Sequence, residues 1–110
     1  MKREVLITLR AQQEADANHK WWAEHRSVEQ AARWYGEFLN ATLQLEDHAE
    51  RCALAAENNA FPYTVRQLNF GLAARPTHRL VYTIHHDRVV VLRVRHLSQQ
   101  SIHGEVPDSD

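Results

Sequence analysis

The first half of the chain carries apolar residues at helical intervals. Residues 10–25 contain neither glycine nor proline and are rich in Ala, Gln and Glu, which favour helices. A second stripe repeats at alternating spacings of four and three, and it comprises Ala31, Tyr35, Phe38, Thr42, Leu45 and Ala49. That period is typical of one helix face. Ser27 and Gln30 form a capping-box pattern, so this second helix is expected to begin near Val28 and to end within residues 48–56.

The second half contains apolar, partly β-branched stretches that predict strands. The candidates are residues 64–70, 79–85 and 89–95, and an earlier strand is expected at residues 4–9. His86 and Asp87 form a tight turn in the short connection between the last two, which predicts an antiparallel hairpin although the turn lacks the favoured glycine. The order β-α-α-β-β-β gives an α+β fold, with an N-terminal strand and a two-helix hairpin packed on a mainly antiparallel sheet. The opening strand is expected at a sheet edge, beside the last strand or the first strand of the meander.

Length and composition bound the architecture. A chain of 110 residues with 44% apolar and 25% charged residues has the balance of one globular domain, which excludes disorder of the whole chain. We expect this domain to span residues 1–104. Residues 105–110 are expected to form a disordered tail.

The sequence indicates a cytoplasmic protein without membrane contact. No apolar run approaches the roughly 20 residues of a membrane-spanning helix. The N-terminal apolar stretch is too short for a signal peptide. Cys52 is the only cysteine, so no internal disulfide can form, and we expect it to pack as a small apolar side chain rather than to act as a nucleophile.

The eight histidines do not form a metal-ligand pattern. His85 and His86 are adjacent, and adjacent strand residues point to opposite faces. His19 and His25 are six residues apart on a predicted helix, so they do not share one helix face. No metal and no cofactor are therefore expected.

Charge is distributed unevenly along the chain. Residues 1–60 carry seven Lys/Arg against ten Asp/Glu, whereas residues 61–104 carry six arginines against Asp87 alone. A guanidinium is a planar fork that matches phosphate or carboxylate. The basic block therefore indicates a surface for nucleic acid or an acidic partner, and a solvated sheet face is the alternative.

Strand alternation sorts the last two strands into two faces. One face, expected to be exposed, contains Arg79, Val81, Thr83, Val91, Arg93 and Arg95. The other, expected against the helices, contains Leu80, Tyr82, Ile84, Val90, Leu92 and Val94. RNA cleavage needs a base, a phosphate-binding cation and an acid. An arginine of the open face can supply the cation, and His96 at the strand end is the nearest group with a suitable pKa. The alternative is that His96 only caps the strand edge.

Aromatic residues cluster in the predicted helices. Tyr35 and Phe38 lie on the apolar stripe and are expected to pack in the core rather than to stack on bases. Trp21 and Trp22 are about 100° apart on a helix, so both cannot face the core. One of them is expected to be exposed and available to a partner.

The chain resembles the RelE/ParE toxin superfamily over roughly residues 4–99. The stretches that carry the resemblance are residues 31–35, 64–71, 78–84 and 89–96. The strand Arg79-Leu80-Val81-Tyr82 followed by a hairpin and a valine-rich strand is its most specific part. The resemblance implies a bacterial toxin that a cognate antitoxin neutralises, with a possible toxin–antitoxin hetero-oligomer.

Two branches of the superfamily differ in activity. RelE-like members cut messenger RNA on the ribosome, which would make Arg79 and His96 catalytic candidates. ParE-like members inhibit DNA gyrase and need no catalytic residues. The strand around Arg66 lacks the paired lysines of the nucleases, and residues 97–100 lack their basic or tyrosine residue, so we favour the ParE-like branch.

The resemblance also leaves open an inactive homologue that only binds its antitoxin. Whichever branch applies, we expect the arginines of the last strands to contact the target or the antitoxin. These residues are Arg66, Arg79, Arg93 and Arg95.

Overall fold

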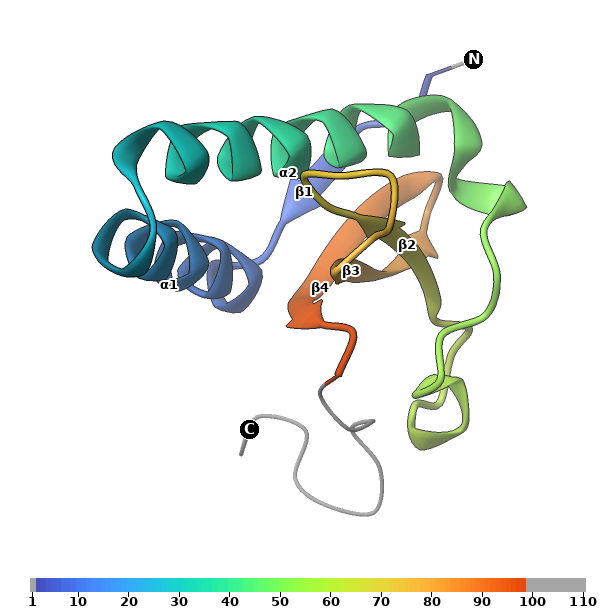
Figure 1. Cartoon of the computed structure of the whole chain (residues 1–110). Coiled ribbons are helices and arrows are strands. Elements are labelled where there is room, and N and C mark those ends of the chain that lie inside the picture. The colour runs from blue at the N-terminus through green and yellow to red at the C-terminus, as the bar shows by residue number, and fades with distance from the viewer. Residues whose placement is uncertain (1, 99–110) are drawn as a thin grey trace.

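The computed structural model describes residues 2–98, so the tail expected at residues 105–110 lies outside the described residues. Its elements follow the predicted order β-α-α-β-β-β (Figure 1). They are β1 (Val5–Ile7), α1 (Leu9–His25), α2 (Val28–His48), β2 (Arg66–Phe70), β3 (His78–His85) and β4 (Arg88–His96), with short 3-10 turns at Ala49–Arg51 and Asn58–Ala60.

Both helices begin at a hydroxyl side chain. Ser27 Oγ accepts a hydrogen bond from the Gln30 amide at 3.0 Å, as the capping-box pattern predicts. Thr8 Oγ1 accepts from the Ala11 amide at 3.2 Å and so caps α1. The opening strand is therefore shorter than predicted, because Leu9 already belongs to the helix.

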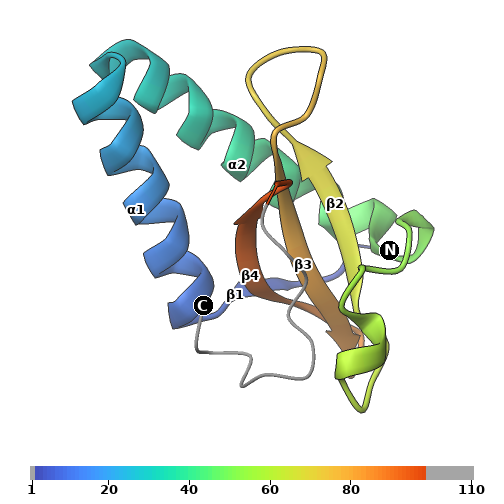
Figure 2. The same cartoon turned by 60° about the horizontal axis from the view of Figure 1, so that its bottom comes forward.

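The sheet has the strand order β1-β4-β3-β2. β1 lies at an edge and pairs parallel with β4, while β2, β3 and β4 form an antiparallel meander. The prediction of an edge strand beside the last strand is confirmed. Beyond β1 the chain turns into α1, which runs on beside β4 (Figure 2). There Thr8 Oγ1 donates to the Val91 carbonyl at 2.9 Å, and Glu14 Oε1 accepts from the Val94 amide at 2.8 Å.

The main core lies between the helices and one face of the sheet. Ala11 and Ala15 are fully buried, and their small side chains let α1 approach its neighbours closely. The large buried side chains of this core are Trp34, Phe38, Leu45, Leu80, Tyr82, Val89 and Val91. Tyr35 and Phe38 pack as predicted, with Tyr35 half-buried at the edge of this core.

A β-bulge changes which residues of β4 face the helices. Val81 pairs with Arg93, but the next residue, Tyr82, pairs with Val91, so Leu92 is the extra residue. Val91 consequently packs in the main core, whereas Leu92 packs on the opposite face. Strict alternation had placed Val90 and Leu92 against the helices and Val91 on the other face, and those predictions are wrong because one added residue reverses the faces.

The second sheet face is partly covered by residues 52–65. Leu54 forms an isolated bridge with Arg66, and the Ala55 amide donates to the Val65 carbonyl at 2.8 Å. This segment therefore continues the sheet beyond β2. Its apolar side chains Ala55, Phe61 and Val65 pack with Val81 of β3 and Leu92 of β4 to form a second, small core on this face.

Candidate functional site

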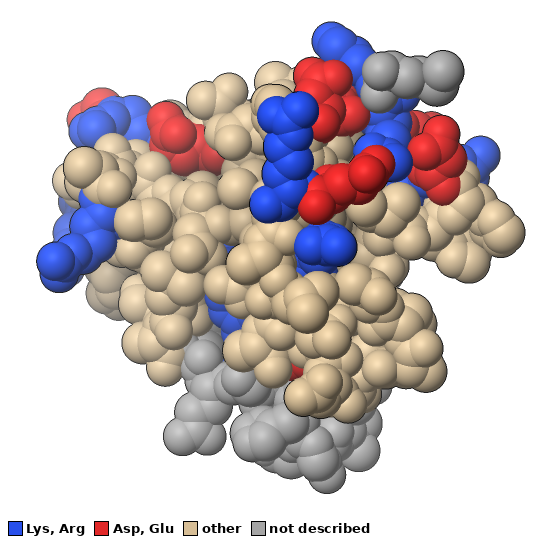
Figure 3. Space-filling model, turned by 90° about the vertical axis from the view of Figure 1, so that its right-hand side faces the viewer, with Lys and Arg blue, Asp and Glu red and all other residues tan. Residues whose placement is uncertain are grey.

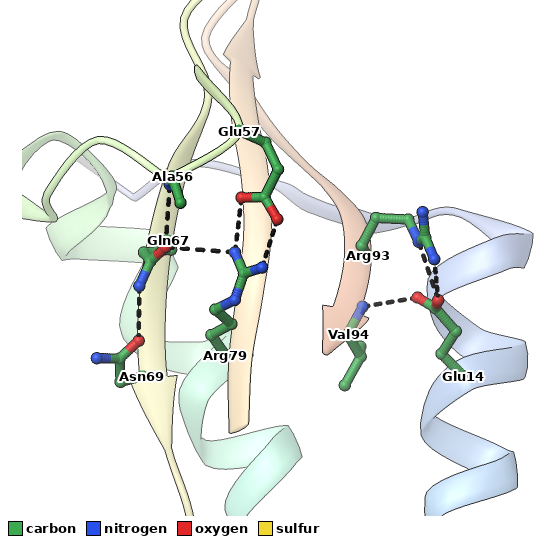
Figure 4. Close-up of polar contacts among 8 residues, drawn as sticks. All are labelled: Glu14, Ala56, Glu57, Gln67, Asn69, Arg79, Arg93 and Val94. Carbon is green, nitrogen blue, oxygen red and sulfur yellow. Dashed lines mark hydrogen bonds and ion pairs between the residues drawn. The ribbon is translucent and has the colours of Figure 1, made fainter. Parts of the chain in front are cut away.

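Arg79 occupies the centre of the covered face and pairs with Glu57. The two guanidinium nitrogens donate to the two carboxylate oxygens, with 2.7 Å between Nη1 and Oε1 (Figure 4). Arg79 is 3% exposed and Glu57 is 1% exposed. The sequence prediction that Arg79 stands on an open face is therefore wrong. Its guanidinium binds Glu57, which belongs to the segment of the same chain that covers this sheet face.

Neighbouring amides extend this ion pair. Gln67 Oε1 accepts from Arg79 Nη1 at 3.3 Å and from the Ala56 amide at 3.4 Å. Gln67 Nε2 donates to Asn69 Oδ1 at 3.1 Å. These contacts link β2, β3 and the covering segment, so the geometry of Arg79 depends on all three (Figure 4).

Arg93 pairs with a carboxylate of α1. Its Nε and Nη2 donate to Glu14 Oε2 at 2.9 and 2.6 Å. The other oxygen of Glu14 accepts the Val94 amide, at a part of the β4 edge that lies beyond β1. The Glu14 carboxylate thus binds the Arg93 guanidinium and also accepts the hydrogen bond that a neighbouring strand would otherwise accept from Val94. Both contacts fix α1 against β4.

The other two predicted arginines differ in exposure. Arg66 is half-buried, and its Nη1 donates to the Cys52 carbonyl at 2.7 Å. Arg95 is 4% exposed, and burial together with the nearby charges of Arg93 and Arg79 lowers its pKa. The structure therefore brings Arg79, Arg93 and Arg95 together, but within the protein rather than on its surface.

A pocket of about 390 Å³ lies where the end of α1 meets the ends of β3 and β4. Its walls are Asn18, Trp21, Trp22, Arg26, Thr77, His78 and His96. Trp21 is 43% exposed, while Trp22 packs against the main core, so the prediction that the two tryptophans do not both face the core and that one is exposed is confirmed. The pocket combines an apolar wall with a guanidinium and imidazoles. It therefore suits an apolar or aromatic group that carries a polar end.

His78 in this pocket is held in its neutral form. Its Nδ1 accepts from Trp34 Nε1 at 3.3 Å, and its Nε2 donates to Asn18 Oδ1 at 3.0 Å. Thr77 Oγ1 also lies 2.8 Å from Nδ1. Burial, with a smaller contribution from the charge of His96, lowers the pKa of His78 to about 4. A proton on Nδ1 would face the indole donor, which agrees with this direction.

Arg79 and His96, the two catalytic candidates, point to opposite sides of the sheet. His78 pairs with His96, and their rings lie 4.9 Å apart on the helix side, where His78 bonds to Trp34 of α2. Arg79 is the next residue on the strand, and it bonds to Glu57 on the other side. A strand's neighbouring side chains diverge, so Arg79 and His96 cannot meet on one phosphate.

Exposed charges gather at another place, where the N-terminus, the end of α2 and the β3–β4 hairpin meet (Figure 3). Arg3 pairs there with Glu50 and Asp87, and Arg88 pairs with Glu4 at 3.1 Å. Opposite charges alternate in this cluster, so it does not form the basic surface that the uneven charge distribution had predicted.

Two residues important to these sites were missed by sequence reasoning. Glu57 stands between Ala56 and Asn58 in a segment expected to be a loop, and the only signal for it was that a buried arginine needs an acidic partner. His78 precedes a predicted strand and carried no signal of its own. Cys52 was interpreted correctly, since it packs half-buried against the main core.

Within residues 2–98, no three His, Cys, Asp or Glu side chains converge in a way that can hold a metal ion. In the same part of the chain, no helix has the length and apolar character needed to cross a membrane.

Comparisons with known proteins agree with the fold and the sequence resemblance. No curated protein matches the chain. Among solved structures, a chain of the chromosomal ParDE toxin–antitoxin system from P. aeruginosa superposes with a TM-score of 0.71. That match has 16% sequence identity and covers 88% of this chain and 98% of the other, so it supports the fold alone. The family model of the ParE toxin of the type II toxin–antitoxin system parDE matches residues 5–101. The chain therefore belongs to the ParE toxin family of type II toxin–antitoxin systems.

Proposed function

We propose that this toxin arrests growth by binding and inhibiting DNA gyrase, without cutting RNA. The observation that carries the proposal is the divergence of Arg79 and His96 across the sheet. A ribonuclease needs a cation and a proton-transfer group on the same phosphate. Here the cation is already paired with Glu57, and His96 faces the other side. An inhibitor that acts by binding has no such requirement.

In this proposal the buried arginines affect partners indirectly. Arg79 fixes residues 52–65 on the sheet, and Arg93 fixes α1 beside β4, so both determine the shape of the surface that gyrase or the antitoxin meets. Arg66 is the more accessible of the predicted contacts, because it is half-buried beside the Cys52 carbonyl. The toxin acts in the cytoplasm, where both partners are found.

The proposal is tested by inducing the chain in bacteria with and without its cognate antitoxin. Growth should slow with the toxin alone and recover with the antitoxin. A reporter plasmid from the arrested cells should lose negative supercoils, while mapped messenger 5′ ends stay unchanged. His96→Gln should remain toxic, because the substitution keeps the side-chain size and removes only the proton transfer.

Each alternative has its own result in this experiment. Cleavage of ribosome-bound messenger with unchanged plasmid topology, abolished by His96→Gln, would identify a RelE-like nuclease and reject the proposal. Unimpaired growth at confirmed expression, with antitoxin binding retained, would identify an inactive homologue.

A further inference from the structure

The pocket at the end of α1 has two walls, and the proposed function uses neither of them. Trp21 and Trp22 lie three and four residues after Asn18, so α1 presents all three side chains on one side. The start of β3 and the end of β4 supply the other wall. The volume of about 390 Å³ lies within the range of roughly 300–1,000 Å³ that is typical of small-molecule sites. The pocket is therefore large enough for a whole small molecule.

The α1 wall of this pocket offers aromatic surface. Trp21 is 43% exposed, and its ring meets that of Trp22 edge-on, with centroids 5.7 Å apart and planes 89° apart. His25, which is not part of the wall, stacks on Trp21 with a centroid distance of 4.8 Å and holds the indole in place. A third ring can stack on one indole and meet the edge of the other, and aromatic rings prefer both arrangements. The wall therefore favours a flat aromatic group.

Arg26 gives the pocket a positive charge. Its guanidinium carbon lies 5.6 Å from the centre of the Trp21 ring, a cation–π contact that keeps the charge at the aromatic wall. Within residues 2–98, Arg26 forms no ion pair, whereas the buried Arg79 and Arg93 each bind a carboxylate. None of the described residues that line the pocket is acidic. A carboxylate from outside the chain therefore complements this wall, and a guanidinium can bind both of its oxygens.

The polar side chains around His78 are already hydrogen-bonded within the protein. His78 Nε2 donates to Asn18 Oδ1 at 3.0 Å, and Asn18 Nδ2 donates to the Glu14 carbonyl at 3.0 Å. His78 is neutral near pH 7, since burial lowers its pKa to about 4. These groups add no charge that competes with Arg26. The anionic end of a ligand is therefore directed to Arg26, and its ring to the indoles.

The C-terminal end of α1 opposes anion binding, but its effect is smaller than that of Arg26. The last carbonyls of a helix together carry a charge of roughly −0.5, against the full positive charge of a guanidinium. Two of these carbonyls are already hydrogen-bonded. The Trp21 carbonyl accepts from His25 Nδ1 at 3.0 Å, and the Trp22 carbonyl accepts from the Arg26 amide at 2.9 Å. The local balance of charge therefore stays positive.

We propose that this pocket binds a small aromatic carboxylic acid. The ring lies against Trp21 and Trp22, and the carboxylate pairs with Arg26. The aromatic wall and the cation belong to one pocket, so a single small molecule satisfies both without the flanking contacts that a protein partner needs. The proposal does not depend on which target the toxin has.

Calorimetric titration of the full chain with three matched probes tests the ligand class. Indole-3-acetate carries both a ring and a carboxylate, indole-3-acetamide has the same shape without the charge, and acetate has the charge without the ring. Indole-3-acetate should bind with one molecule per chain and about tenfold more tightly than the amide, as a hydrogen-bonded charge pair predicts. Acetate should give no binding heat at the same concentrations.

Two substitutions test whether the probe binds in the pocket. Arg26→Gln should lower the affinity for indole-3-acetate to that for the amide and leave amide binding unchanged, because only the charge is lost. Trp21→Ala should weaken binding of both probes, because it removes the ring contact. Arg33→Gln is the matched control: Arg33 is exposed on α2, outside the pocket, so this variant should bind as the wild type does. Thermal unfolding of each variant verifies that it is folded.

Three results would overturn the proposal. The first is the absence of indole-3-acetate binding at millimolar concentrations. If Arg26→Gln then also weakens antitoxin binding, the pocket belongs to the antitoxin instead. The second is equal affinity for indole-3-acetate and its amide, which would show that Arg26 does not recognise the carboxylate. The third is binding that both substitutions leave unchanged, which would place the ligand elsewhere on the protein.

Discussion

At the scale of single residues, the central feature is a buried ion pair where the sequence indicated an exposed cation. Strand alternation correctly placed Arg79 on the face away from the helices. It could not show that residues 52–65 fold over that face, because those residues have no strong periodicity. The requirement that a buried arginine needs an acidic partner is met by Glu57.

Arg79→Ala should therefore destabilise the fold, since it leaves the Glu57 carboxylate buried without its guanidinium. Removal of one partner of a buried ion pair costs about 3–5 kcal/mol. Urea unfolding of the variant should show a loss of that order. Arg75→Ala, in the exposed β2–β3 loop, is the control and should change stability by less than about 0.5 kcal/mol.

A double-mutant cycle at Arg79 and Glu57 separates the effect of losing the ion pair from the effect of losing side-chain packing. Arg79→Met combined with Glu57→Leu removes both charges, and it should be less destabilising than either single substitution. Unfolding free energies of the two singles and the double provide the comparison. A double variant as unstable as the sum of the singles would show that the two side chains act independently.

His78 gives a prediction for pH dependence. Its folded-state pKa is about 4, whereas an unfolded histidine titrates near 6.5. The unfolded state therefore binds more protons between these values, and stability should fall as pH decreases from about 6.5 to about 4. His78→Gln should reduce this slope by up to one proton. Unfolding measured at several pH values tests it, and an equal slope in both proteins would show that other groups control the dependence.

At the scale of elements, the β3–β4 hairpin carries local strain. His86 and Asp87 have φ angles of 51° and 65°, the left-handed region that the tight turn requires. The two-residue spacing predicted this hairpin correctly, in spite of the missing glycine. The main chain is therefore forced into a conformation that ordinary side chains disfavour.

His86→Gly should stabilise the protein by up to about 1 kcal/mol, because glycine adopts positive φ without a steric cost. The neighbouring His85→Gly should instead destabilise it by about 0.5–1 kcal/mol, since His85 lies in β3. Thermal unfolding of the two variants is the measurement. If both lower the melting temperature, the turn does not carry the strain inferred from its φ angles.

Most elements could be predicted from sequence because apolar periodicity and caps act locally. The second helix began at Val28 as Ser27 predicted, and the opening strand lies at a sheet edge beside the last strand, one of the two positions expected for it. The bulge at Leu92 could not be predicted, because one extra residue leaves no trace in a run of valines. The pocket around His96 also depended on contacts between distant elements.

At the scale of the whole molecule, the two sides of the sheet have different roles. The helix side holds the main core and the pocket with His96, and the other side holds the Arg79–Glu57 pair under residues 52–65. This separation is the reason to expect a toxin that acts by binding. An inhibitor of that kind must be present in amounts comparable to those of its target, whereas one nuclease molecule can cleave many messenger molecules.

The most direct test of this account is a titration of purified toxin against a fixed concentration of gyrase in a supercoiling assay. Inhibition should rise in proportion to added toxin and level off near one toxin per gyrase subunit, and His96→Gln should give the same curve. In a parallel translation reaction, ribosome-bound messenger should remain intact. Messenger cleavage at toxin amounts far below those of the ribosomes, with gyrase unaffected, would contradict the account.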